Sequence, residues 1–236
     1  MLTGLSIRDV VLIESLDLEF GPGLGVLTRY LAERVAHVHA VELDRSLEPQ
    51  LPRGPNVTVH WGDALALDLA AVAPGATKLV ANLPYNVATP IVVESLAGLP
   101  RIGRWCVMVQ REVADRFFAV PSTKAYGAVS VLVQLVTERV GFHPVARTVF
   151  RPRPNVDSAL VAFRRVELPE NFARIKKVVG AGFAHRRKTL PNSLELAGLA
   201  SRTSAVEALA TIGRDSTTRA EALAPREFAA LTAGLR

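Results

Sequence analysis

Cysteine is nearly absent from this chain, with Cys106 the single example among 236 residues. One thiol excludes an internal disulfide framework and any zinc site built from several cysteines, so no metal is expected. No apolar run approaches the ~18 residues that a membrane helix needs. The opening segment carries Asp9, Glu14 and Asp17 where a signal peptide would be apolar. These absences predict a cytoplasmic protein that makes no membrane contact.

The familiar nucleotide motifs are also missing. The glycine-rich segment Gly21-Pro22-Gly23-Leu24-Gly25 is not followed by Gly-Lys-Ser/Thr, and its spacing differs from Gly-x-Gly-x-x-Gly. A nucleoside triphosphate or a dinucleotide is therefore a poor fit. Glycines before a helix still allow a ligand to approach the backbone and place helix N–H groups near an anion. A turn shaped for packing alone is the alternative.

Charge is distributed unevenly along a chain that is 49% hydrophobic and 21% charged, which is typical of a globular protein. Residues 1–100 carry a net charge of −5, residues 101–165 carry +7, and residues 166–236 carry +4. An acidic first part and a basic remainder favour two kinds of ligand, a small molecule and a polyanion. Chance distribution of solvated charges is the alternative explanation.

The first part of the chain alternates between short β-branched runs and helical segments. This pattern predicts an α/β fold with a mostly parallel sheet covered by helices on both faces. Thr89 and Pro90 suit the cap and first residue of a helix that continues through Leu96. Helical periodicity alone follows residue 166, so we expect domains at 1–165 and 166–236. The predicted strands cover residues 15–20, 37–41, 57–60, 78–81, 105–109 and 158–163.

Two acids follow successive predicted strands. Glu42 ends the second strand, where this kind of sheet places a carboxylate on ribose hydroxyls, and Asp63 follows the third strand. Asp63 can accept a hydrogen bond from an adenine amino group. Together with the glycine-rich segment, the acids predict S-adenosylmethionine as the cofactor. The alternative is a helix cap for Asp63 and a surface position for Glu42.

Asn82-Leu83-Pro84-Tyr85 follows the fourth predicted strand at the same edge. An adenine amine is a weak nucleophile because its lone pair is delocalised into the ring. The Asn82 amide oxygen and the Pro84 carbonyl are candidates to accept its two N–H bonds, with the proline ring setting the direction of that carbonyl. Tyr85 offers a face for an unstacked base. A strand-ending turn without chemistry is the alternative.

These motifs together resemble those of the small-subunit ribosomal RNA adenine N6,N6-dimethyltransferases, from about residue 18 to the C-terminus. The resemblance implies a Rossmann-like class I methyltransferase sheet with a small C-terminal helical subdomain that contacts RNA. It also implies dimethylation of two adjacent adenosines in a hairpin loop near the 3′ end of 16S rRNA, within the small ribosomal subunit or its precursor, by a monomer. The matching segments are 21–25, 41–44, 62–64, 82–86, 150–158 and 184–194.

Carried over position by position, the resemblance implies two groups of site residues. The cofactor contacts are Gly21, Gly23, Gly25, Glu42, Asp63, Ala64 and Asn82. The residues that handle the target base are Asn82, Pro84, Tyr85 and Phe150, with core packing at a strand end as the alternative for Phe150.

The basic segments themselves predict RNA contacts, because their charges suit phosphate beside a stacking aromatic residue. The predicted contacts are Arg147, Arg151, Arg153, Arg186, Arg187 and Lys188. A solvated surface is the alternative for each basic run.

The segment before Gly21 departs from the family pattern, because it lacks the Gln-Asn-Phe-Leu sequence that touches the cofactor in relatives. We expect this difference to affect cofactor affinity more than the fold. Three other functions stay open: a weakly active or inactive ribosome-assembly factor, a methyltransferase for 23S rRNA, and one for DNA adenine or protein glutamine.

Overall fold

The computed structural model describes residues 17–20, 25–150 and 153–235, with side chains from Gly25 onward. The chain divides into two compact units. Unit 1 contains the residues up to Ala114 and Glu138–Arg165, and unit 2 contains Asp115–Thr137 and the residues from Val166 onward. The polypeptide therefore enters unit 2 twice.

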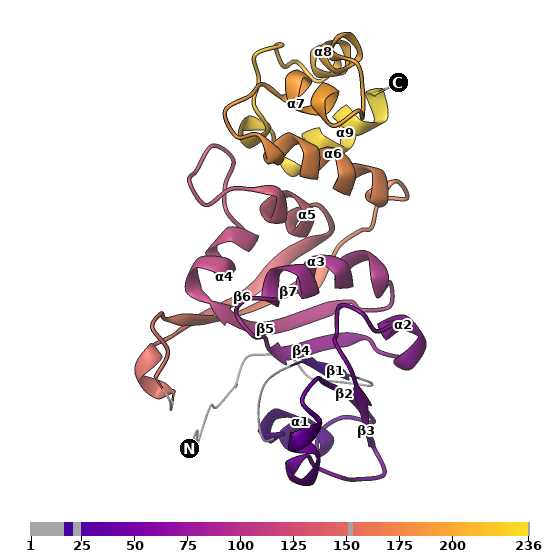
Figure 1. Cartoon of the computed structure of the whole chain (residues 1–236), viewed down its shortest axis with the longest axis vertical. Helices are drawn as coiled ribbons and strands as arrows, with labels where there is room; N and C mark the ends of the chain where they lie inside the picture. Colours follow the sequence, from indigo (N-terminus) through magenta and orange to yellow (C-terminus); the bar gives the residue numbers. More distant parts are fainter. Residues whose placement is uncertain (1–16, 21–24, 151–152, 236) are drawn as a thin grey trace. The chain divides into compact units, whose positions relative to one another are not determined.

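Unit 1 is built on a sheet whose described strands follow the order β3-β2-β1-β4-β5-β7-β6 (Figure 1). Strands β1 to β5 run parallel, and β7 pairs antiparallel with β5. The carboxyl ends of the five parallel strands consequently share one edge of the sheet, as the predicted α/β fold requires. The strands are β1 (Asp17–Phe20), β2 (Val38–Glu42), β3 (Val57–Trp61), β4 (Lys78–Asn82), β5 (Arg104–Gln110), β6 (Thr137–Val145) and β7 (Ser158–Arg165).

Helices cover both faces of this sheet. Leu31 of α1 packs with Val38 of β2, whereas Ser95 of α3 accepts a hydrogen bond from the Trp105 indole at 2.8 Å. Strand register places Val38 and Trp105 on opposite faces, because Arg104 is the β5 residue in line with Val38. The helices of this unit are α1 (Val26–Ala32), η1 (Arg45–Gln50), α2 (Leu69–Val72), α3 (Ala88–Gly98), η2 (Arg147–Val149) and the first residues of α4 (Arg111–Phe117), whose last three residues belong to unit 2.

Helix α3 begins one residue before the predicted cap. Its N-cap is Val87, so the prediction of Thr89 as the cap was wrong. The reason is local: the Pro84 carbonyl accepts the backbone N–H groups of Val87 and Ala88, three and four residues later, which starts the helical turn before Thr89. Pro90 still lies in the first turn, where a missing N–H costs no hydrogen bond.

Unit 2 is helical in the part that the structure describes. Its elements are α5 (Ala128–Val136), α6 (Phe172–Ala184), α7 (Leu190–Leu196), α8 (Arg202–Thr211), η3 (Ala220–Ala222) and α9 (Pro225–Gly234). The rings of Tyr126, Phe183 and Phe228 form a chain of contacts at 6.0 and 5.9 Å between centroids. No described helix has the length and apolarity to cross a membrane.

Segment 115–137 belongs to unit 2, although it precedes the boundary expected at residue 165. The Tyr126 hydroxyl donates to the Leu223 carbonyl at 2.7 Å, and the Ser122 N–H donates to the Glu221 carbonyl at 2.8 Å. Both bonds join this segment to residues about a hundred positions later. Such contacts leave no local pattern in the sequence.

Candidate functional site

Glu42 is the last residue of β2 and is half-buried. Its carboxylate accepts the backbone N–H of Asp44 at 2.9 Å, and its carbonyl accepts the N–H of Gly62 at 3.0 Å. The second bond ties the ends of β2 and β3 together. Glu42 and Asp63 therefore lie at neighbouring strand ends on the carboxyl edge, as the sequence predicts.

Asp63 follows Gly62, which has a φ of 156°. The exposed Asp63 carboxylate accepts the Leu65 N–H at 2.9 Å and shapes the turn after β3. This turn role does not compete with ligand binding, because a carboxylate has two oxygens and about four acceptor positions. Ala64 follows in the same turn and is half-buried.

Gly25 is the N-cap of α1 and has a left-handed backbone, with φ 64° and ψ 28°. A Cβ atom at this position would lie 2.4 Å from Cδ of Pro52, which is too close for any side chain. Both the conformation and the space demand glycine here. Gly21 and Gly23, predicted to contact the same cofactor, lie outside the described residues.

The Asn82 loop leaves β4 at the same edge. Asn82 is half-buried, and among the described residues its carboxamide makes no hydrogen bond. The next residue, Leu83, is buried and donates its N–H to the Met108 carbonyl of β5 at 3.0 Å. The backbone of the loop is thus held while the Asn82 side chain keeps its donors and acceptor.

The Pro84 carbonyl, predicted to accept a hydrogen bond from the target amine, already accepts two hydrogen bonds within the chain. That oxygen accepts the N–H groups of Val87 at 3.1 Å and Ala88 at 3.0 Å. A carbonyl oxygen has two lone pairs, so it is engaged by the first turn of α3 and does not suit the expected contact with a target amine. Pro84 instead fixes the path of the loop into the helix.

Tyr85 and Ser158 form a hydrogen bond between their hydroxyl oxygens at 2.7 Å. Ser158 is buried at the start of β7 and lies opposite Gln110, the last residue of β5. The bond joins the Asn82 loop to a strand that begins 73 residues later. Sequence reasoning gave Ser158 no role, because its partner could be found only through the β5–β7 pairing.

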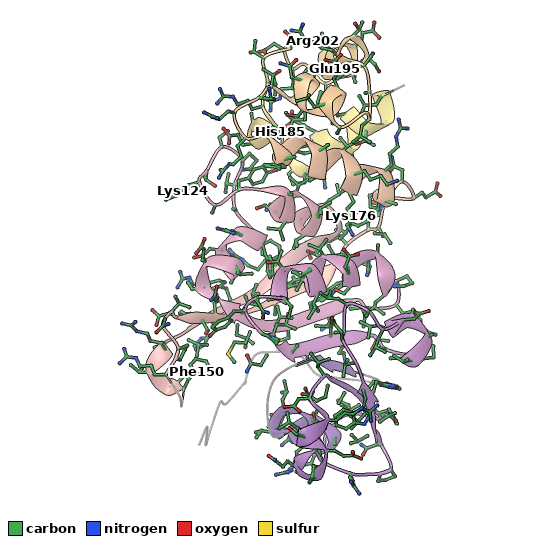
Figure 2. The ribbon with its side chains drawn as sticks, in the orientation of Figure 1. Lys124, Phe150, Lys176, His185, Glu195 and Arg202 are labelled. Atoms are coloured by element: carbon green, nitrogen blue, oxygen red, sulfur yellow. The ribbon has the colours of Figure 1, made fainter. Side chains whose placement is uncertain are left out.

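Phe150 ends the turn η2 in the connection between β6 and β7 (Figure 2). The turn is anchored by Arg147, whose backbone N–H donates to the Asp157 carboxylate at 2.9 Å and whose guanidinium donates to the Asn155 carbonyl at 3.0 Å. Phe150 is half-buried and Arg153 is exposed. Arg151 lies outside the described residues. The anchor is Asp157, the residue directly before β7. No role was predicted for it, although an acid directly before the predicted strand was a signal that could have suggested one.

Arg186, Arg187 and Lys188 lie in unit 2, directly after α6, and all three are exposed. Arg186 is 4.0 Å from the half-buried Glu221 carboxylate, and such a long contact to a solvent-exposed arginine contributes little to stability. Solvent-facing cations on a turn are suited to contact with phosphate. Among the described residues, no group of three or more His, Cys, Asp or Glu side chains is arranged to hold a metal ion.

The family model described as ribosomal RNA adenine dimethylase matches residues 12–229. The chain belongs to this family. A ribosomal RNA small subunit methyltransferase A from Rubrobacter xylanophilus is 46% identical over 233 residues, covering 97% of this chain and 86% of the relative. The protein of the same name from Lactiplantibacillus plantarum is 45% identical and covers 92% of this chain and 79% of the relative.

Two solved structures share the fold of the family. A dimethyladenosine transferase from Plasmodium falciparum has a TM-score of 0.73 and 22% identity, over 92% of this chain and 88% of that one. The 23S rRNA methyltransferase ErmE has a TM-score of 0.61 and 27% identity, over 94% of this chain and 91% of that one. The predicted class I methyltransferase fold is confirmed.

S-adenosylmethionine is the cofactor expected for this family, and the described residues fit it. Gly25 ends the glycine-rich segment with a left-handed backbone and begins α1 at the same edge of the sheet. Glu42 and Asp63 place two carboxylates at adjacent strand ends, which suits ribose hydroxyls and an adenine amine. Their negative charge also suits a ligand that carries a sulfonium cation.

Proposed function

We propose that this chain transfers methyl groups from S-adenosylmethionine to N6 of two adjacent adenosines in a hairpin loop near the 3′ end of 16S rRNA. The observation that carries the chemistry is the Asn82 loop, which leaves β4 at the carboxyl edge and is fastened to Ser158 through Tyr85. The choice of RNA is supported by the relatives named small subunit methyltransferase A. We further propose that the protein acts as a monomer on the small subunit or its precursor.

The cofactor pocket is proposed to lie at the carboxyl ends of β2, β3 and β4. Glu42 would accept the ribose hydroxyls, Asp63 the adenine amine, and the backbone at Gly25 and Ala64 would allow close approach. When bound, S-adenosylmethionine supplies an electrophilic methyl carbon on a positively charged sulfur. Asn82 ends β4 beside this pocket and would orient the nucleophile.

The target amine needs two hydrogen-bond acceptors to leave the plane of its ring. The Asn82 amide oxygen is proposed as the first. Since the Pro84 carbonyl is engaged by α3, we assign the second contact to the remaining oxygen between them, the Leu83 carbonyl. The two acceptors would turn the nitrogen lone pair toward the methyl group that bound S-adenosylmethionine would supply, and the surplus proton of the methylated nitrogen would pass to water. No general base is needed before attack.

The unstacked adenine would lie on Tyr85, with Phe150 as a second aromatic surface. Arg147 and Arg153 of unit 1 and Arg186, Arg187 and Lys188 of unit 2 would contact phosphates. This division assigns cofactor binding to the first domain and part of the RNA contact to the C-terminal helices. RNA affinity should fall by about tenfold or more between 50 and 200 mM salt for several phosphate contacts.

The test is transfer of radiolabelled methyl groups to unmethylated small-subunit particles, compared with duplex DNA and a glutamine peptide. Asn82→Ala should lower kcat on the order of 10²-fold, because it removes a preorganised acceptor. Asn171→Ala removes the same carboxamide from an exposed site in unit 2 and should retain full activity. Wild-type label in DNA or peptide alone, or binding of particles without transfer, would reject the proposal.

A further inference from the structure

Gln110 is the last residue of β5 and lies at the carboxyl edge of the sheet. Its side chain is half-buried, and among the described residues its carboxamide makes no hydrogen bond. It therefore does not cap α4, which begins at the next residue. Because a half-buried polar group is normally hydrogen-bonded, a free carboxamide at this edge is suited to contact with a ligand. No motif of the sequence analysis contains Gln110.

Strand register places Gln110 on the same face of the sheet as Asn82. Strands β4 and β5 are neighbours in the sheet (Figure 1). Asn82 is in register with Met108, and Gln110 follows two residues later on the same strand. Because side chains alternate between the faces of a strand, all three share one face. The backbones at Asn82 and Gln110 are consequently about 5 Å apart across the strands and about 7 Å apart along them. Both carboxamides can reach a purine that lies between them.

The other neighbour of Gln110 is Ser158 of β7. The two residues are directly opposite each other in the antiparallel β5–β7 pair. In such a pair the side chains lie on the same face, with Cβ atoms about 4.5–5.5 Å apart. The Ser158 hydroxyl is hydrogen-bonded to Tyr85 at 2.7 Å. Gln110 therefore lies beside the contact that holds Tyr85, and all of these residues belong to unit 1.

The chemistry of a carboxamide matches a part of the target base that the Asn82 loop does not use. In the proposed function, the oxygens of Asn82 and Leu83 accept both hydrogens of the N6 amine, so the ring nitrogens need other partners. A glutamine carboxamide has two N–H donors and is one methylene longer than asparagine, so it can reach past the amine to the ring. Bases that are taken out of their stack are commonly read along the Watson–Crick edge, where N1 of adenine is an acceptor beside the amine.

We propose that the Gln110 carboxamide donates a hydrogen bond to N1 of the target adenine while Asn82 holds the amine. The inference rests on the proposed function and adds to it a residue that determines base specificity. The contact orients the ring on Tyr85, so its loss should weaken binding of the base.

The experiment measures binding of fluorescent RNA hairpins that differ only at the two adjacent target bases in the loop. One hairpin carries adenine, a second carries 1-deazaadenine, in which a C–H group replaces N1, and a third carries 7-deazaadenine. The wild-type protein should bind the adenine hairpin about threefold to tenfold more tightly than the 1-deazaadenine hairpin, the effect of one hydrogen bond. It should bind the 7-deazaadenine hairpin as tightly as the adenine hairpin. Gln110→Ala should bind all three equally, at the weaker level, because the two losses of a direct contact are not additive.

Two further variants separate the lost donor from lost packing and from general effects. Gln110→Glu keeps the shape of the side chain but presents a carboxylate oxygen in place of the N–H donor, so it should also lose the preference for adenine over 1-deazaadenine. Gln50→Ala removes the same carboxamide from an exposed position in η1 and should keep the full preference. Thermal unfolding reports whether each variant is folded. With small-subunit particles, Gln110→Ala should raise the KM for particles and leave the KM for S-adenosylmethionine at the wild-type value.

Equal binding of the adenine and 1-deazaadenine hairpins by the wild-type protein would overturn the inference. A full preference in folded Gln110→Ala, or sensitivity to 7-deazaadenine alone, would overturn it as well. Hairpin binding needs no methyl transfer, so these measurements test Gln110 even if the particles are not methylated. Failure of wild-type transfer to the particles would instead reject the proposed function.

Discussion

The Tyr85 hydroxyl lies 2.7 Å from Oγ of Ser158 and joins the Asn82 loop to the first residue of β7. Tyr85 follows the central parallel strand β4, whereas Ser158 opens a strand that runs the other way. The bond therefore couples the residue expected to support the target base to the segment that carries Phe150 and its arginines. The position of Tyr85 depends on both sides of this contact.

Tyr85→Phe keeps the aromatic face and removes the hydroxyl, so it should lower kcat by about twofold to tenfold, the effect of one hydrogen bond. Ser158→Ala should have the same effect, and the double variant should be no worse than either single variant. Methylation kinetics of the three proteins form a double-mutant cycle. Additive losses would show that the two hydroxyls act independently.

Gly25→Ala should weaken cofactor binding and lower the unfolding free energy by about 1–2 kcal/mol, since φ is positive and Cδ of Pro52 occupies the Cβ position. Calorimetric titration with S-adenosylmethionine and chemical denaturation measure the two effects. Gly98→Ala is the matched control, because this glycine ends α3 and no atom lies within 4 Å of its added Cβ. It should be neutral or slightly stabilising. Equal behaviour of the two variants would contradict the strain argument.

Three histidines form a cluster on β2, β3 and the residue preceding β2. Nδ1 of His39 and Nε2 of His60 are 2.9 Å apart, and the rings of His37 and His39 are 4.6 Å apart. Burial, followed by the charges of His37 and His60, lowers the pKa of His39 to about 4, and burial also lowers the pKa of His60. The folded protein therefore keeps the His39 and His60 rings neutral over a pH range in which the same histidines of the unfolded chain bind protons.

Stability should consequently fall as the pH drops below about 6.5, the ordinary histidine value, and the loss should level off near the folded pKa of His39, about 4. Because the rings are partly solvated, the loss from His39 is on the order of 1 kcal/mol. Urea denaturation from pH 7.5 to 4 measures it. His39→Asn should reduce the pH dependence, whereas His143→Asn on β6 should preserve it. An unchanged dependence in His39→Asn would refute the prediction.

Arg165 stabilises the connection between α3 and β5 from the end of β7. Its guanidinium donates to the carbonyls of Leu96, Leu99 and Ile102 at 2.9, 3.2 and 2.8 Å and lies 5.0 Å from the Trp105 ring. Burial lowers the pKa of Arg165. The lysine ammonium cannot reproduce this planar arrangement of N–H donors.

Arg165→Lys should lower the unfolding free energy by about 2–3 kcal/mol, because buried carbonyls lose their donors. Arg164→Ala, which breaks only the exposed ion pair with Glu138, should cost less than about 1 kcal/mol. Denaturation midpoints compare the two. At denaturant concentrations below its unfolding transition, Arg165→Lys should retain the wild-type kcat. A loss of kcat in the folded variant would contradict a purely structural role.

Local patterns were sufficient to predict the strand ends that carry Glu42, Asp63 and Asn82. Alternating β-branched runs mark parallel strands, and a polar residue at the end of each run must reach the carboxyl edge. The same reasoning missed β6, where Gly141 and Pro144 interrupt the pattern. Helix α5 was also not predicted, because Ala128–Val136 is rich in β-branched residues, which favour strands. The segment is nevertheless a buried helix whose start is capped by Ser130.

The sequence by itself determined the class of fold, the order of the parallel strands along the chain and the residues offered at their ends, because these follow from short-range periodicity and motif chemistry. The tertiary structure alone decided which distant segments meet. It placed β7 antiparallel to β5, so that Ser158 contacts Tyr85 and Arg111 lies beside Phe142. It also joined segment 115–137 to the C-terminal helices. Contacts of this kind depend on packing between elements far apart in the chain, which no local pattern of residues specifies.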